Sequence, residues 1–252
     1  MSGFFNPDNA FFTFMGKFFD LIVLNLVWLV LYVPFAVFAI LFAMTRALIF
    51  LIPAIASLII FVPSMIAMYY AVAKSIIHSR SYPVKEFFRS FKANFKQGAI
   101  ASVIFLAAGG LLAVDFKYSY DLIVAQDGKG LTYLLVFLVI TFFVSGMLIY
   151  FCPLLSRFTM DLKSAFKMSF GLTLKHFWCT LLSFILWAAV ALLSWLTRGM
   201  LLFLVVGIAM VLGAGMMEKV LKKYINKPDE NAGSGEAGEE GEGPKKDEWY
   251  LE

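Results

Sequence analysis

Long apolar stretches alternate along this chain with shorter connections that carry most of its charge. Each stretch is close to the ~20 apolar residues that a helix needs to cross a bilayer, and the pattern predicts about six such helices. They cover residues 21–44, 47–73, 98–114, 131–155, 177–196 and 200–217. The sequence therefore predicts an all-α fold, a polytopic transmembrane bundle. Only Thr197, Arg198 and Gly199 join the last two spans, which predicts an antiparallel hairpin.

The first two stretches are open to two interpretations. Only Arg46 interrupts the apolar pattern between them, and Pro34, Pro53 and Pro63 lie inside them. Because proline lacks the amide hydrogen and its ring clashes with the preceding turn, we expect kinks that neighbouring helices must compensate. Residues 21–73 form either two full spans or one long re-entrant arrangement.

Lysine and arginine gather in every second connection. Fifteen of them lie at Lys17, in the connections 74–96 and 157–175, and in residues 219–227. Only four lie in the alternate connections: Arg46, Lys117, Lys129 and Arg198. Because cytoplasmic loops carry the excess of Lys and Arg in membrane proteins, we expect both termini and both basic connections in the cytoplasm. Six spans are consistent with this alternation.

Composition narrows the class and divides the chain. Hydrophobic residues make up 61% and charged residues only 15%, against about 25% charged in a typical soluble domain, which excludes a soluble domain. The membrane domain is expected to cover residues 1–227. Residues 228–252 hold nine of the seventeen acids, and their Gly- and Glu-rich composition predicts a disordered, acidic cytoplasmic tail.

Residues 84–96 carry the most distinctive local pattern. On a helix of about 100° per residue, phenylalanines and cations fall in separate arcs. The apolar arc holds Val84, Phe87, Phe88, Phe91 and Phe95, and the basic arc holds Lys85, Arg89, Lys92 and Lys96. We expect an amphipathic helix in the cytoplasmic interface, drawn to anionic lipid headgroups. It is either a docking surface for a partner or an elbow leading into the third span. No nucleic-acid partner is expected, because each basic group adjoins a membrane boundary.

A weak internal repeat links the two basic connections. Residues 68–70 (MYY) followed by 84–89 are similar to residues 149–151 (IYF) followed by 162–167, and each unit then enters an apolar stretch. The similarity reflects either a parallel structural repeat, as in some transporters, or convergent loop composition.

Few side chains in the apolar stretches could carry chemistry. Asp20 and Asn25 lie near the start of the first stretch, five residues apart and therefore not quite on one helix face. The remaining polar residues are scattered Ser and Thr, which commonly serve helix packing. The predicted spans contain no deeply placed Glu, Lys, Arg or His, and this disfavours ion-coupled transport by the chain alone.

No cluster of residues outside the spans indicates a reaction. His78 and His176 lie in different connections without a neighbouring Cys, Asp or Glu cluster, and Cys152 and Cys179 are interpreted as small apolar fillers. A Gly-rich phosphate loop with Lys-Ser/Thr is missing from the sequence, so the chain is not itself an ATPase. The sequence therefore predicts no enzyme activity, no metal and no cofactor.

Four segments resemble the YesL-type family of bacterial membrane proteins. They are residues 4–7 (FFNP), 20–26 (DLIVLNL), 67–70 (AMYY) and 87–97 (FFRSFKANFKQ). The resemblance covers residues 4–220, is most specific over the first hundred, and departs at 37–60, where this chain has an additional apolar stretch. The family carries a domain of unknown function and is commonly encoded beside carbohydrate ABC importers. The resemblance implies a non-enzymatic accessory protein of a sugar-uptake system in a bacterial cytoplasmic membrane, with the lipid bilayer and ABC transporter subunits as partners.

Two other classes remain as alternatives. A stand-alone small-molecule permease would need a polar lining around a cavity, and the scattered Ser and Thr supply little of one. An intramembrane enzyme would need a clustered carboxylate, histidine or nucleophile pair, and the sequence offers none.

Overall fold

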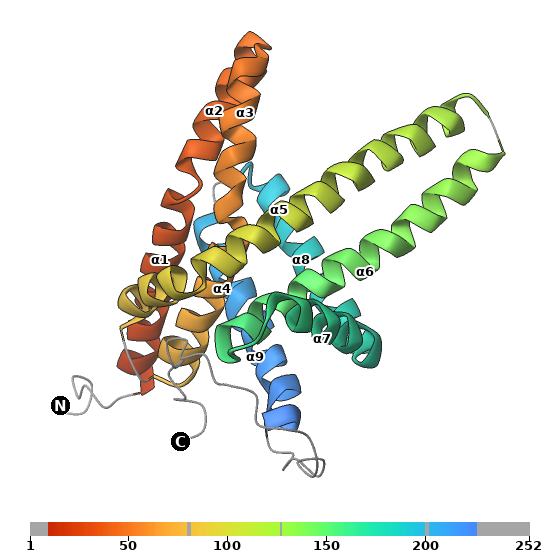
Figure 1. The fold of residues 1–252 in the computed structure, drawn as a ribbon. Helices are drawn as coiled ribbons and strands as arrows, with labels where there is room; N and C mark the ends of the chain where they lie inside the picture. The colour runs from red at the N-terminus through yellow and green to blue at the C-terminus, as the bar shows by residue number, and fades with distance from the viewer. Residues whose placement is uncertain (1–9, 80–81, 127, 200–201, 226–252) are drawn as a thin grey trace.

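The computed structural model describes residues 10–79, 82–126, 128–199 and 202–225, and every regular element in these ranges is a helix. This confirms the predicted all-α fold. Five described segments are long and apolar enough to cross a membrane: Thr13–Val30, Leu48–Ile77, Pro83–Val124, Lys129–Arg157 and Phe177–Leu196. The sixth predicted span, 200–217, falls mainly in a further helix, and its first two residues lie outside the described ranges. Figure 1 shows the resulting bundle, from which two helical hairpins project.

The first predicted span consists of two helices. α1 (Ala10–Val30) begins well before the predicted boundary, and a turn at residues 31–32 separates it from α2 (Val33–Thr45). Pro34 explains the turn, because its ring would clash with the carbonyl of Val30 and it has no N–H to donate there. The expected proline kink is therefore present, and it breaks the helix completely.

The second arm runs back beside the first. Arg46 caps the C-terminal end of α2. Its backbone adopts a φ of 56°, and its N–H donates to the carbonyl of Phe42 at 2.8 Å. α3 (Leu48–Ser57) then packs against α2 as an antiparallel partner (Figure 1). Residues 21–73 thus form two antiparallel helical arms. α2 has no buried residue and α3 buries only Ala54, so the hairpin projects from the bundle.

A second proline interrupts the returning arm. The short 3-10 segment η1 (Leu58–Ile60) separates α3 from α4 (Phe61–Ala71), and Pro63 lies one turn further along. At this change of backbone geometry, the N–H of Val62 donates to Ser102 Oγ of α5 at 2.9 Å. The neighbouring helix therefore satisfies the amide group that the break exposes, as the membrane interior requires.

α5 (Pro83–Val124) corrects one of the sequence predictions. The amphipathic segment 84–96 and the third span, 98–114, form one continuous 42-residue helix without an elbow between them. A single glycine at position 98 costs a helix only about 1 kcal/mol relative to alanine, and Gly98 allows the helix to pass close to Pro63 of α4. At 1.5 Å per residue the helix is about 63 Å long, so its ends extend beyond an apolar layer of about 30 Å.

The remaining helices complete the bundle. α6 (Lys129–Arg157) returns antiparallel to α5, and α7 (Leu162–Lys175) packs back against α6. α8 (Phe177–Leu196) has the bounds that the sequence predicts, and α9 (Leu202–Ile225) packs against α8 and α1.

The core lies around α4, where nine of the eleven residues are buried. α4, α1, α9 and the turn after α4 share one apolar cluster. A second cluster joins α5, α6 and α7 through three aromatic rings: Phe105 lies 5.7 Å from Phe151 and 5.5 Å from Phe166, between ring centroids. The cytoplasmic ends predicted for these helices therefore pack together tightly, while the hairpin tips project outward.

Candidate functional site

A buried ion pair joins the turn that follows α4 to the start of α5. Lys74 lies in η2 (Val72–Ile77), a π-helical turn that continues α4, and its Nζ lies 3.4 Å from Glu86 Oε2 on α5. Both side chains are less than a tenth exposed. Lys74 Nζ also donates to Tyr70 Oη at 3.4 Å and lies 5.6 Å from the centre of the Tyr70 ring. Such π-helical turns often mark functional or strained positions in helices.

A second buried group of charges gathers around Glu218 on α9. Arg157, the last residue of α6, forms an ion pair with Glu218, and both side chains are almost fully buried. His78, directly after η2, places its Nε2 3.4 Å from the same carboxylate. Because isolated charges are costly to bury, this shared carboxylate fixes α6, α9 and η2 relative to one another.

These charges refine what the sequence predicts. Lys74 and Arg157, two of the cations assigned to the cytoplasmic connections, are buried inside segments long enough to span a membrane. His78, for which the sequence predicts no neighbouring Cys, Asp or Glu cluster, contacts a single acid, Glu218. One signal was available: Glu86 is a lone acid within a strongly basic connection.

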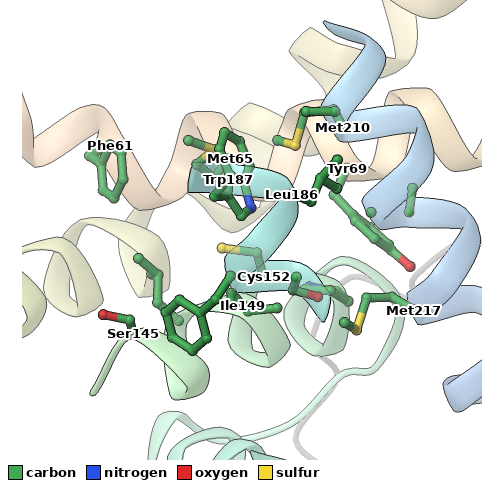
Figure 2. Close-up of a pocket in the computed structure, with 17 residues that line it drawn as sticks. Phe61, Met65, Tyr69, Ser145, Ile149, Cys152, Leu186, Trp187, Met210 and Met217 are labelled. Carbon is green, nitrogen blue, oxygen red and sulfur yellow. The ribbon is translucent and has the colours of Figure 1, made fainter. Parts of the chain in front are cut away.

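An apolar cavity of about 410 Å³ lies between α4, α6, α8 and α9 (Figure 2). Its walls are mostly aromatic and aliphatic side chains. The lining residues are Phe61, Met65, Tyr69, Ser145, Leu148, Ile149, Cys152, Pro153, Ser183, Phe184, Leu186, Trp187, Ala209, Met210, Gly213, Ala214 and Met217. A volume of this size falls within the range of roughly 300–1,000 Å³ that small-molecule sites occupy.

The few polar groups of the cavity differ in how they are satisfied. Ser183 Oγ donates to the carbonyl of Cys179 at 2.9 Å, within its own helix. Tyr69 is only 5% exposed, and its hydroxyl has no hydrogen-bond partner among the described residues. Figure 2 shows the Tyr69 ring on the α9 side of the cavity. Met217 also lines the cavity and directly precedes Glu218 in α9, so the cavity adjoins the buried ion pair of Glu218.

The predicted basic face lies at the surface of α5. Its members Lys85, Arg89, Lys92 and Lys96 are all exposed. Lys163 and Lys167, two of the exposed cations of α7, lie in the other basic connection, which the charge pattern assigns to the same side of the membrane. We refer to these six side chains as the basic surface.

The phenylalanines of the same segment do not form a single lipid-facing strip. Phe87 is fully buried and belongs to the main core, whereas Phe88 and Phe95 are 42% and 41% exposed. Phe91 is partly buried and stacks between its neighbours, 6.2 Å from Phe87 and 5.4 Å from Phe95. The expectation of one phenylalanine face in the bilayer boundary is wrong for Phe87, because α1, η2 and α4 cover that side of α5.

The polar pair at the start of the first span is not brought together. Asp20 is exposed, while Asn25 is fully buried beside Gly207 of α9. Cys152 and Cys179 are both free thiols, and Cys152 lines the cavity. Within the described ranges, no three His, Cys, Asp or Glu side chains lie close enough to hold a metal ion.

The two units of the suggested repeat share one feature and differ in another. Tyr69 on α4 and Tyr150 on α6 are both buried near the predicted cytoplasmic ends of their helices. However, the first basic segment continues straight into its span, whereas the second ends at His176, whose carbonyl accepts a hydrogen bond from Tyr150 Oη at 3.3 Å.

The fold and this site define a multi-pass helical membrane protein with an apolar internal cavity and buried ion pairs at one end. A family model described as "Protein of unknown function, DUF624" matches residues 21–116. The match agrees with the YesL-type resemblance, since YesL-type proteins carry this domain. It extends from α1 through most of α5 and includes both members of the Lys74–Glu86 pair. No curated protein and no solved structure matches the chain.

Proposed function

We propose that this protein is a non-enzymatic accessory protein of the bacterial cytoplasmic membrane that supports a carbohydrate ABC uptake system. The observation that carries the proposal is the basic surface, defined above, whose six cations are exposed on α5 and α7. The YesL-type resemblance and the match to DUF624 over residues 21–116 support the same family context. Catalysis belongs to the partner in this proposal, and the present chain supplies a membrane-embedded docking platform.

Buried ion pairs support the role of this end as a docking platform. Lys74–Glu86 and Arg157–Glu218 connect η2, α5, α6 and α9, and Glu86 also lies 3.9 Å from Arg89 of the basic surface. A rigid support reduces the conformational entropy that a surface loses when a partner binds. Cations concentrated at a membrane surface also attract acidic partners and anionic headgroups.

The cavity argues against the alternative, a stand-alone sugar permease. A sugar pathway needs hydrogen-bonding groups for many hydroxyls, because a polar solute that leaves water without new hydrogen bonds pays a large desolvation cost. The cavity walls instead consist mainly of residues such as Phe61, Leu148 and Trp187. The permease therefore remains the second candidate.

The test combines growth with crosslinking in cells. Deleting the gene is expected to impair growth on one carbohydrate while growth on glucose continues. The substitutions Lys85→Glu, Lys92→Glu and Lys96→Glu, made together, are expected to reproduce this defect and to lower the recovery of ABC subunits after crosslinking. Twelve of the fifteen cations remain on that side, which should preserve the orientation.

A matched control reverses cations in the alternate connections. Arg46→Glu, Lys117→Glu and Arg198→Glu change the net charge equally, and all three positions are exposed. This variant is expected to behave like the wild type. Normal growth of the deletion strain on every carbohydrate, together with no recovered ABC subunit, contradicts the proposal. Uptake of a sugar into liposomes that contain only this chain favours the permease.

A further inference from the structure

The internal cavity is suited to a flexible apolar molecule. Its walls offer aromatic and aliphatic carbon from four helices, and its volume is about 410 Å³. Apolar cavities of this kind exclude water, because a buried water needs two to four polar partners. An apolar ligand gains free energy there without displacing hydrogen-bonded solvent. The ligand chemistry is therefore hydrocarbon over most of its length.

The surroundings of the cavity supply such hydrocarbon. α8 forms one wall through Leu186 and Trp187, and it also presents Leu182 and Ile185, which are 51% and 58% exposed and do not line the cavity. In a segment that spans a bilayer, a face of this kind contacts acyl chains. The cavity is itself partly open to the surroundings of the bundle, so acyl chains of a bilayer could reach it.

One polar group marks an end of the cavity. The Tyr69 hydroxyl is buried and has no hydrogen-bond partner within the described part of the chain. A buried hydroxyl without a partner costs free energy, which a ligand acceptor would recover. Met217, which lines the cavity, directly precedes the buried Glu218 in α9, so the cavity reaches the buried ion pair of Glu218. A ligand with a hydrocarbon chain and an acceptor at one end satisfies both features.

We infer that the cavity binds one acyl chain of a membrane phospholipid, whose ester carbonyl accepts a hydrogen bond from Tyr69. The chain lies against Met65, Trp187 and Met210, and the ester lies beside α9. A sugar does not suit this lining, because the walls cannot satisfy its hydroxyls. This inference is independent of any ABC partner and concerns a structural or regulatory lipid.

Gly213 offers a direct way to block the site. It lines the cavity on α9, and a Cβ atom added there meets no other atom within 4 Å. Leucine at this position therefore fills the cavity without a clash with its nearest neighbours. Gly215, two residues further along the same helix, also has open space around it but does not line the cavity. Gly215→Leu is thus the matched control.

The experiment uses the full chain in liposomes that contain a trace of phosphatidylglycerol with a photoreactive diazirine near the end of its ester-linked acyl chain. After illumination, mass spectrometry locates the crosslinked residues. We expect crosslinks at cavity residues such as Trp187 and Met210, and at the exposed Ile185 of α8. Gly213→Leu should lower the yield of cavity crosslinks at least fivefold and leave the Ile185 crosslinks unchanged. Gly215→Leu should leave the yield of both sets of crosslinks unchanged.

A second variant tests the polar contact. Tyr69→Phe should lower cavity crosslinking by about threefold for the ester-linked probe, since one hydrogen bond is lost, and should leave an ether-linked probe unaffected. Crosslinks at Ile185 alone, or cavity crosslinks of equal yield in the wild type and Gly213→Leu, overturn the inference. Equal effects of Tyr69→Phe on both probes overturn the assignment of the ester to Tyr69.

Discussion

Arg157, the last residue of α6, and Glu218, in the second half of α9, form an ion pair with 2% and 5% of their surface exposed. His78 approaches the same carboxylate from the end of η2. One acidic residue thus joins segments that the sequence separates widely. Because the cost of burying each charge is offset only by its partner, the ends of these helices depend on one another.

Removing one member of this pair should destabilise the protein strongly. Arg157→Met leaves the Glu218 carboxylate buried beside a weak partner, and we expect the free energy of unfolding to fall by about 3–5 kcal/mol. The double substitution Arg157→Met and Glu218→Met should recover most of that loss, because no uncompensated charge remains. Denaturant titration in detergent, followed by intrinsic fluorescence, measures both values.

The exposed contact of Arg89 provides the comparison. Its guanidinium lies 3.9 Å from Glu86, and more than half of the Arg89 side chain is exposed. Solvent screening limits such contacts to at most about 1 kcal/mol, so Arg89→Met should change stability little. If Arg157→Met lowers the free energy of unfolding no more than Arg89→Met does, burial of the Arg157–Glu218 pair does not strengthen its contribution to stability.

Gly98 controls how closely α5 approaches α4. A Cβ at this position would lie 2.9–3.0 Å from atoms of Pro63, including backbone atoms that cannot move away easily. We expect Gly98→Ala to lower the free energy of unfolding by about 1–3 kcal/mol through overpacking. Gly110 lies on the same helix in open space, and Gly110→Ala should leave stability unchanged or raise it by up to about 1 kcal/mol. Equal melting temperatures of the two variants contradict the close packing.

The phenylalanines of α5 should divide by burial. Phe87→Ala removes a fully buried ring from the main core, and we expect a loss of about 3–5 kcal/mol. Phe95→Ala removes a ring that is 41% exposed, and the loss should be clearly smaller. The thermal midpoints of both variants in the same detergent measure this difference. A larger loss for Phe95→Ala than for Phe87→Ala would indicate that Phe87, and not Phe95, faces the lipid.

The orientation that the cation pattern predicts can be tested by labelling. In a background without Cys152 and Cys179, single cysteines at Tyr120 and Gly128 should react with an impermeant reagent added to whole cells. Cysteines at Lys92 and Lys163 should react only after the membrane is permeabilised. All four positions are exposed. The nearby Ser119 is unsuitable for labelling, because it is buried and donates a hydrogen bond to the carbonyl of Asp115. Labelling of Lys92→Cys from outside would reverse the predicted topology.

Much of the fold could be predicted because a bilayer acts on each helix separately. α8 has the predicted bounds 177–196, and α6 contains the predicted stretch 131–155. A spanning helix must be apolar along its length whatever its neighbours are, so local composition is sufficient. The alternation of cation-rich and cation-poor connections also acts on each segment separately. The Lys74–Glu86 and Arg157–Glu218 pairs agree with this alternation, because each pair joins helix ends that the cation pattern assigns to the same side.

The structure alone decided which residues meet. Hydropathy could not distinguish Phe87 from Phe88, since only the packing of α1, α4 and η2 against α5 buries one and exposes the other. The ion pairs of Glu218, the close contact of Gly98 with Pro63, and the cavity between α4, α6, α8 and α9 likewise join distant parts of the chain. The sequence by itself determined the all-α fold and which connections carry the cations, because these depend on the solvent around each segment. Partners and cavities required the tertiary structure, because they depend on contacts between segments whose pairing no local pattern encodes.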